Sequence, residues 1–198
     1  MTRIVAIVEG DGEVKALPIL LRRLASEWAN DYIHVDIPPP IRVKRDRFLN
    51  KAAEFERHLT LAASKSGPHD WILVLLDADD DCPAKLGKQI LERAQRHVPH
   101  RQVSAVLANR EYEAWFLAAA QSLNGVHGFA IPVDEIVDAE KPRNAKRWME
   151  KHIHDEVYDE VKDQPAFTAH FNLQQAFDNS RSFRKLCTEW AQHVRKTP

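Results

Sequence analysis

The chain has 198 residues, of which 44% are hydrophobic and 29% charged, a balance that is typical of a folded domain and excludes wholesale disorder. Lysine and arginine number 28 and aspartate and glutamate 29, so the formal net charge is −1. A free-standing histone-like or cold-shock-like nucleic-acid binder is usually more basic, so the net charge argues against that class. It does not exclude an enzyme whose charge is segregated into patches.

The sequence indicates a cytoplasmic protein with no membrane partner. Cys82 and Cys187 stand far apart and form no CxxC pair, so nothing suggests a disulfide framework, and a reducing compartment is the simplest. The first apolar run, Ile4 to Val8, is too short for the core of a signal peptide. The longest apolar run, Trp71 to Leu76, is far shorter than a membrane span.

Four segments have the pattern of strands, and helical patterns lie between them. Residues 3–8, 71–76 and 102–108 are nearly continuous apolar runs, typical of strands buried on both faces of a parallel sheet. Residues 32–37 alternate more and run into three prolines, as a strand near a sheet edge does. Apolar residues recur at helical spacing over residues 16–28, 48–59, 86–94 and 111–123.

This alternation predicts an α/β fold with a parallel four-stranded sheet flanked by helices. Glycines and a proline interrupt the pattern beyond about residue 125, where helices are expected over residues 146–154 and 183–195. We therefore expect an α/β core over residues 1–125 and a mainly helical extension over residues 126–198 packed on that core.

Acidic residues follow each strong strand. Glu9 ends the first, Asp77 and Asp79 to Asp81 follow the third, and Glu111 comes shortly after the fourth. Parallel strands bring these ends to one edge of the sheet, and residues i and i+2 of a strand share a face, which suits Asp77 and Asp79. Such an oxygen-rich cluster is typical of Mg²⁺ or Mn²⁺ sites. The alternative is that the aspartates only cap the next helix and that Glu13 only complements a helix dipole.

A Glu-Gly after the first strand and an Asp-x-Asp after a later hydrophobic strand resemble the TOPRIM domain of topoisomerases, DnaG-type primases and OLD-type nucleases. The segments IVEGDGEVKALPILLRRL, WILVLLDADDDCP, NREYEAWFLAA and QPAFTAHFNLQQAFDNSRSFRKL more closely resemble the TOPRIM-like family named as domain of unknown function 4276. The likeness covers most of the chain. It implies a Rossmann-like TOPRIM core with a Mg²⁺ (or Mn²⁺) site.

By this resemblance Glu9, Asp77 and Asp79 would hold the metal and act in catalysis, with Asp81 as a further metal ligand. Glu111 would be the additional acid of the nucleases in this group, with Glu113 as the second choice. Lys15 lies one helical turn past Asp11 and would neutralise a phosphate; its alternative is an ordinary solvated lysine.

Two basic stretches are candidates for contact with nucleic acid. Residues 42–47 supply Arg42, Lys44 and Arg45, and residues 141–151 supply Lys146 and Arg147 beside a tryptophan. Cations with an aromatic ring suit a nucleic-acid backbone and a stacked base, although a solvated loop and an inward-packed tryptophan explain the same pattern.

The resulting hypothesis is a Mg²⁺-dependent TOPRIM-like nuclease that hydrolyses phosphodiester bonds in DNA or RNA. The resemblance also implies an ABC- or SMC-like ATPase partner in an anti-phage defence system. One alternative is a non-catalytic TOPRIM-fold module that binds a partner ATPase or senses a nucleotide or metal. Another is a small-molecule phosphohydrolase or nucleotidyl-transfer enzyme that uses the same acids. The oligomeric state is left open.

Overall fold

A computed structural model describes residues 1–28, 33–154 and 157–194 as a mixed α/β fold built on one parallel sheet of five strands. The strands run in the order β2-β1-β4-β5, and β3 also pairs with β1. They are β1 (Thr2–Val8), β2 (Val35–Asp36), β3 (Ile41–Arg42), β4 (Trp71–Asp77) and β5 (Gln102–Ala108).

The three long strands lie where the apolar runs predict them, but the expected edge strand is divided. β2 pairs with the start of β1 at Thr2 and Arg3, and β3 pairs with its end at Ile7 and Val8. Three consecutive prolines separate the two pieces, and proline has no backbone N–H to donate to a ladder. The prediction of four strands is therefore wrong by one, and Tyr32, the start of the predicted strand, lies outside the described residues.

Helices follow the strands in the predicted alternation, and more of them occur in the C-terminal part than expected. The predicted helix over residues 48–59 forms as two, because the chain is extended at Lys51. The predicted pair beyond residue 125 corresponds to α6 and α9, with α7 and α8 between them. The helices are α1 (Asp11–Arg23), α2 (Arg45–Asn50), α3 (Ala52–Lys65), α4 (Pro83–His97), α5 (Ala114–Ala118), α6 (Ala145–Lys151), α7 (Glu160–His170), α8 (Leu173–Asn179) and α9 (Arg181–His193), with a π-helical turn η1 (Leu24–Trp28) and a 3-10 turn η2 (Ala120–Leu123).

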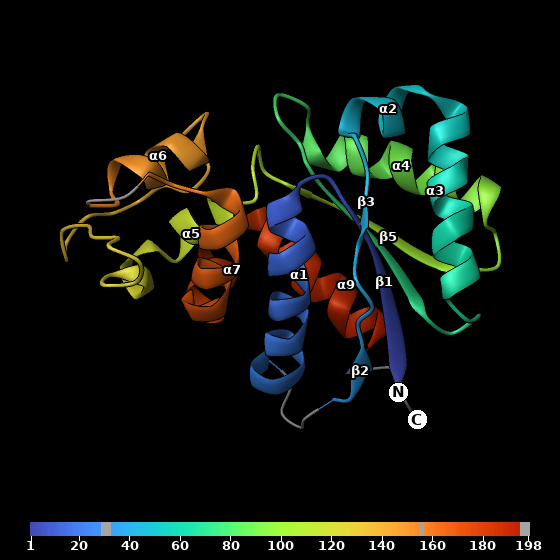
Figure 1. Ribbon diagram of the computed structural model, residues 1–198, viewed down its shortest axis with the longest axis horizontal. Coiled ribbons are helices and arrows are strands. Elements are labelled where there is room, and N and C mark those ends of the chain that lie inside the picture. The colour runs from blue at the N-terminus through green and yellow to red at the C-terminus, as the bar shows by residue number, and fades with distance from the viewer. Residues whose placement is uncertain (29–32, 155–156, 195–198) are drawn as a thin grey trace.

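The sheet separates two apolar clusters, and strand alternation decides which residues enter each. Ile4 and Val8 of β1 face the cluster that contains α1, α7 and α9. Val5 and Ile7 face the cluster that contains α3 and α4. Helices therefore cover both faces of the sheet, as Figure 1 shows. No helix among the residues described is both long and apolar enough to span a lipid bilayer.

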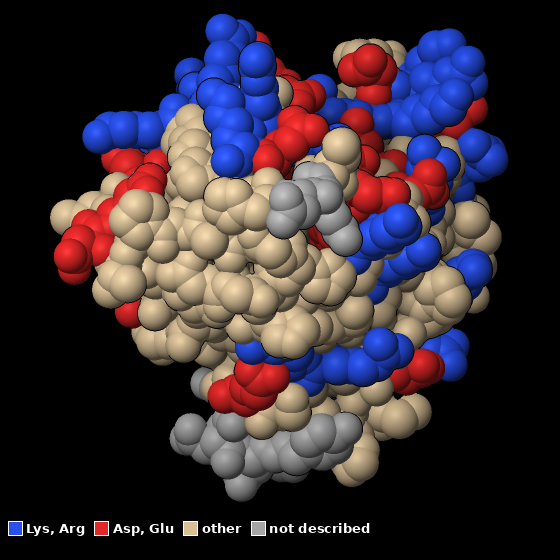
Figure 2. Space-filling view, turned by 60° about the vertical axis from the view of Figure 1, so that its left-hand side comes forward, with Lys and Arg blue, Asp and Glu red and all other residues tan. Residues whose placement is uncertain are grey.

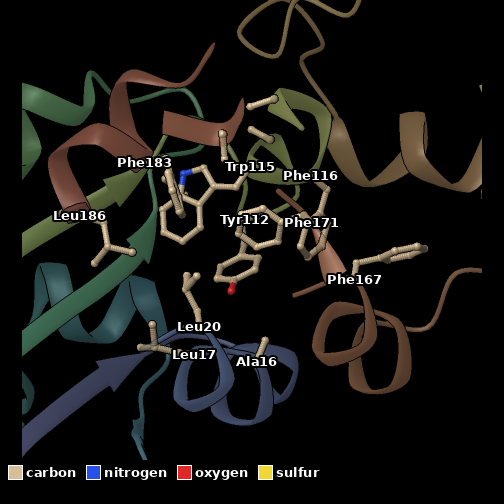
Figure 3. Packing of buried hydrophobic residues seen from close by; sticks show 14 of the residues in the cluster. Ala16, Leu17, Leu20, Tyr112, Trp115, Phe116, Phe167, Phe171, Phe183 and Leu186 are labelled. Carbon is tan, nitrogen blue, oxygen red and sulfur yellow. The ribbon is translucent and has the colours of Figure 1, made fainter. Parts of the chain in front are cut away.

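Aromatic residues join the C-terminal part to the sheet in one continuous core. Phe167 of α7, Phe171 just after α7 and Phe183 of α9 are fully buried and pack against Phe116 and Trp115. Figure 3 shows these rings gathered between α1 and the C-terminal helices. These contacts anchor the C-terminal helices on the core. Beyond residue 125 the described part of the chain has no strand, only an isolated bridge between Phe129 and Ile153.

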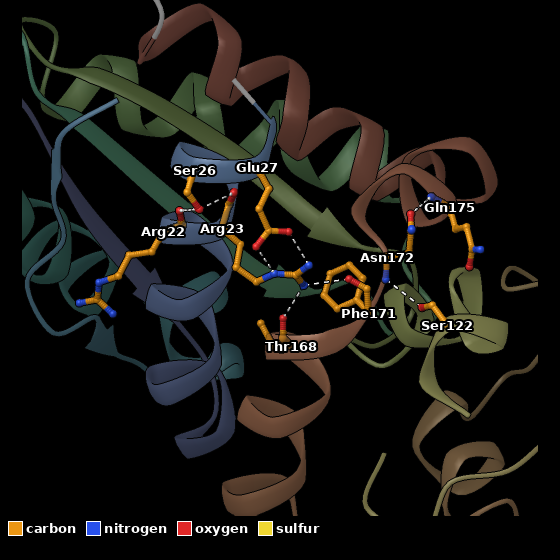
Figure 4. A network of polar contacts seen from close by, with 9 residues as sticks. All are labelled: Arg22, Arg23, Ser26, Glu27, Ser122, Thr168, Phe171, Asn172 and Gln175. Atoms are coloured by element: carbon orange, nitrogen blue, oxygen red, sulfur yellow. Dashed lines mark hydrogen bonds and ion pairs between the residues drawn. The ribbon is translucent and has the colours of Figure 1, made fainter. Parts of the chain in front are cut away.

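Close helix packing and a largely buried cation fix α7 against α1. A Cβ on Gly12 would lie 2.9 Å from the Glu160 carbonyl oxygen, so only glycine lets the two helices approach this closely. At the far end of α1, the Arg23 guanidinium donates to the carbonyl oxygens of Thr168 and Phe171 at 2.9 and 2.8 Å (Figure 4). These contacts satisfy carbonyls at the end of α7, and they place the start of α7 beside the start of α1.

Candidate functional site

The carboxyl ends of β1, β4 and β5 meet at one edge of the sheet, because all the strands are parallel. From β1 the chain passes to β2 and β3 on one side, and from β4 it passes to β5 on the other. β1 and β4 therefore flank the point where the strand order reverses, and open α/β sheets bind ligands in the crevice at such a point. Glu9 directly follows β1 and Asp77 ends β4, so the two predicted residues border this crevice.

Negative charge is concentrated in the crevice. Burial raises the pKa of Asp77 well above its usual value, and the charges of Glu113 and Glu13 raise it further. Burial, followed by the charge of Asp79, raises the pKa of Glu9. Oε2 of Glu9 is buried and has no hydrogen-bond partner within the described ranges. A raised carboxyl pKa means that the ionised form is unfavourable, so this crevice is a place where a cation would be stabilised.

Glu13 also belongs to the carboxylates of the crevice. Its interpretation as an acid that only complements the helix dipole does not account for this position. The residue is only 7% exposed, and burial is the main cause of its raised pKa. Its carboxylate folds back over the end of β1, since a Cβ on Gly10 would lie 2.3 Å from Glu13 Oε2. The sequence signal that points to it is its spacing of four residues from Glu9.

The acid expected after β5 is represented by two glutamates with different surroundings. Glu113 is buried, and its Oε1 accepts hydrogen bonds from the Tyr158 hydroxyl at 2.8 Å and from Gln164 Nε2 at 2.9 Å. Burial raises the pKa of Glu113 to about 7 even though both hydrogen bonds favour the ionised form. Glu111 is half-buried and accepts the backbone N–H of Lys146 at 2.9 Å. Both carboxylates raise the pKa of Asp77.

Asp79 does not continue the alternation of β4, so the argument that it shares a face with Asp77 does not apply. The strand ends at Asp77, and Asp79 has a φ of 50°, in the left-handed region. Its backbone N–H donates to the Arg110 carbonyl oxygen at 2.9 Å, which ties the loop after β4 to the loop after β5. Asp79 still contributes charge to the crevice through its effect on Glu9.

Arg45 holds the loop after β4 in place. Its guanidinium donates to the carbonyl oxygens of Asp77 and Ala78 at 2.9 and 3.1 Å. It also pairs with Asp79 at 3.2 Å and with Asp81 at 2.8 Å, and its side chain is only 11% exposed. Arg45, predicted to contact nucleic acid, is therefore engaged within the protein, and the carboxylate of Asp81, a predicted metal ligand, already has a cationic partner.

The remaining predicted cations of the N-terminal half lie around the crevice. Arg42 pairs with Asp11 at 3.1 Å and is about half exposed. Lys15 on α1 and Lys44 before α2 are exposed, and neither has a carboxylate within ion-pair distance among the residues described. Figure 2 shows basic side chains in two groups along the upper rim of this view, with acidic side chains between them.

Two residues of the second basic stretch, Lys146 and Trp148, make contacts within the protein. Lys146 Nζ pairs with Glu160, while Arg147 is exposed at the start of α6. Trp148 is half-buried, and its ring stacks on His152 with the ring centroids 4.0 Å apart. This supports the inward-packed interpretation of the tryptophan, whereas Arg147 forms no ion pair with the part of the chain that the structure describes.

The donor types at the crevice fit Mg²⁺ or Mn²⁺, because every candidate ligand is a carboxylate. The unpartnered Oε2 of Glu9 and the raised pKa values of Asp77 and Glu13 agree with that. Over the described ranges, no group of three or more His, Cys, Asp or Glu side chains is arranged to hold a metal ion. A metal ion there would require some of these side chains to change position.

Taken together, the fold and the crevice define a parallel α/β protein with a carboxylate-rich edge at the reversal of strand order. Residues 8–190 match the model of the family described as Domain of unknown function (DUF4276), and the chain belongs to that family. No curated protein and no solved structure matches the chain.

Proposed function

We propose that this protein is a divalent-metal-dependent nuclease with a TOPRIM-like core, hydrolysing phosphodiester bonds in DNA or RNA. The observation that carries the proposal is a cluster of four carboxylates at the point where the strand order reverses, Glu9, Glu13, Asp77 and Glu113, whose pKa values are raised by burial first and by neighbouring acidic charges second. Groups with strongly perturbed pKa values in a cleft are candidates for a functional site, and a bound cation would offset the cost of ionising these carboxylates.

Glu9, Asp77 and Glu13 would hold the ion, which in phosphodiester hydrolysis polarises the phosphate and lowers the pKa of an attacking water. Glu113 has a different part: with a pKa of about 7 it carries a proton about half of the time at neutral pH, so it accepts or releases one readily. Tyr158 and Gln164 keep that carboxyl in a fixed position. Lys15, exposed on α1, would neutralise phosphate charge.

The test is a cleavage assay on single- and double-stranded DNA and RNA, with Mg²⁺, Mn²⁺ or EDTA. Asp77→Asn should abolish metal-dependent cleavage, whereas Asp178→Asn, on an exposed position of α8, should leave it unchanged. Equal cleavage by both variants would refute the assignment of the site. Because the resemblance implies an ABC- or SMC-like ATPase partner, the assay is repeated with such an ATPase encoded beside the protein.

One observation favours a second candidate, a non-catalytic module that binds a partner ATPase or senses a nucleotide or metal. The exposed aspartates after β4 are paired with arginines: Asp79 and Asp81 with Arg45, and Asp80 with Arg143 at 2.6 Å. In this candidate the acidic loop is a structural element. Asp77→Asn would then spare partner binding measured by co-purification, and wild type would cleave none of the substrates.

A further inference from the structure

A pocket of about 400 Å³ lies between α2 and α4. Arg45 and Asp81 belong to its wall, so it adjoins the loop that borders the crevice. Arg93 and Arg96 of α4 contribute positive charge to the pocket, and they lie on the same face of the helix because they are three residues apart. Asn50 and Gln89 add neutral hydrogen-bonding groups to the lining.

Arg93 is held in a defined orientation rather than free in solvent. Its Nη1 donates to the Leu49 carbonyl oxygen at 2.7 Å, and its guanidinium carbon lies 3.9 Å from the centroid of the Phe55 ring. One hydrogen bond and one stacked face leave the other N–H groups of the guanidinium for a ligand. Fixing the side chain in the free protein reduces the entropy that binding would otherwise cost.

Arg93 and Arg96 form no ion pair within the described ranges. The pocket also contains two carboxylates, but Asp81 pairs with Arg45 at 2.8 Å and Glu92 lies 3.9 Å from Lys88. Neither Arg93 nor Arg96 has a carboxylate oxygen within 4.0 Å among the described residues. Burial, followed by the nearby charge of Arg96, lowers the pKa of Arg93, while the charge of Glu56 acts in the opposite direction.

We propose that the pocket between α2 and α4 is a phosphate-binding subsite formed by Arg93 and Arg96, which receives a backbone phosphate of a nucleic-acid strand. Guanidinium groups suit this ligand because their planar N–H donors match the oxygens of a phosphate. The inference rests on the proposed function in one respect: the strand would run from the carboxylate crevice across Arg45 into the pocket. A free phosphate or a mononucleotide has the same chemistry and is the alternative source.

The test is binding of a fluorescently labelled oligodeoxynucleotide in EDTA, followed by anisotropy across a range of salt concentrations. The variants are Arg93→Gln/Arg96→Gln and Arg96→Gln alone, because Arg96 is exposed and its loss does not disturb the contacts of Arg93. The matched control is Arg22→Gln/Lys65→Gln, which removes two cations at the opposite edge of the sheet, at the ends of α1 and α3.

We expect the double variant to bind about tenfold more weakly and to lower the slope of log affinity against log salt by about 1, while the control stays within about twofold of wild type. The single Arg96 variant should show part of this loss. Unchanged affinity and slope in both pocket variants would overturn the proposal. A competition experiment gives a second way to overturn the proposal. If inorganic phosphate or a mononucleotide displaces the labelled strand at the same concentration as unlabelled oligonucleotide does, the pocket serves a small ligand.

Binding in EDTA separates this inference from the proposed function. Loss of binding in the pocket variants, with no cleavage by wild type in any metal, would support the subsite and refute the nuclease. Metal-dependent cleavage that requires Asp77, with normal oligonucleotide binding by the pocket variants, would support the nuclease and refute the subsite.

Discussion

Replacing Glu113 by glutamine should remove a large part of the pH dependence of stability. The pKa of Glu113 is about 7 in the folded protein, against a reference value of 4.5. Between these values the folded state binds more protons than the unfolded state, so the free energy of unfolding falls as the pH rises. From pH 5 to pH 8 the share due to Glu113 is about 2 to 3 kcal/mol. Glutamine carries no charge, and its amide oxygen still accepts from Tyr158.

The assay is urea unfolding followed by circular dichroism at several pH values from 5 to 8, in EDTA. Wild type should lose stability over this range, because the pKa values of Asp77, Glu9 and Glu13 are raised in the same direction. The loss of stability in Glu113→Gln should be smaller than that of wild type by about 2 to 3 kcal/mol. Glu150→Gln, on an exposed position of α6, should lose as much stability as wild type. A Glu113→Gln curve parallel to that of wild type would refute the assignment of this buried proton.

Three further outcomes are expected. Mn²⁺ at about 100 times its dissociation constant should raise the free energy of unfolding by about 2.7 kcal/mol at pH 7.5, and Asp77→Asn should abolish the increase in a urea titration. Arg45→Gln should lower the free energy of unfolding by about 3 kcal/mol in the same titration, because a largely buried guanidinium and its contacts with four oxygen atoms are lost. A decrease below about 0.5 kcal/mol would contradict the role of Arg45 in holding the loop after β4. Gly12→Ala should lower the free energy of unfolding by about 1–3 kcal/mol, because its Cβ would lie 2.9 Å from the Glu160 carbonyl oxygen. Gly87→Ala should cost less, because its Cβ would lie 3.2 Å from the end of the Leu107 side chain and at an ordinary contact distance of 3.5 Å from the Ala105 carbonyl oxygen; equal costs would refute the packing argument.

The sequence predicts the sheet well because the relevant signal is local. Residues 71–76 and 102–108 are apolar on both faces, and strands buried on both sides need no distant partner to be recognised. The same reasoning brings Glu9 and Asp77 to one edge of the sheet, since parallel strands share the direction of their ends.

Other features depend on contacts between residues far apart in the chain. Nothing around Glu113 indicates that Tyr158 and Gln164, some 45 and 51 residues later, hold its carboxyl in the core. Basic residues in a run look alike in sequence, yet Arg45 is enclosed by the acidic loop, whereas Lys44 beside it is exposed.

By itself, then, the sequence determined the α/β class, the three long parallel strands and the edge at which Glu9 and Asp77 meet, because hydrophobic periodicity and strand direction are properties of short segments. Only the tertiary structure decided which charges are buried, which are paired and which are left for a ligand. Burial and ion pairing are set by the packing of α7 on α1 and of the acidic loop on Arg45, which join segments distant in the chain.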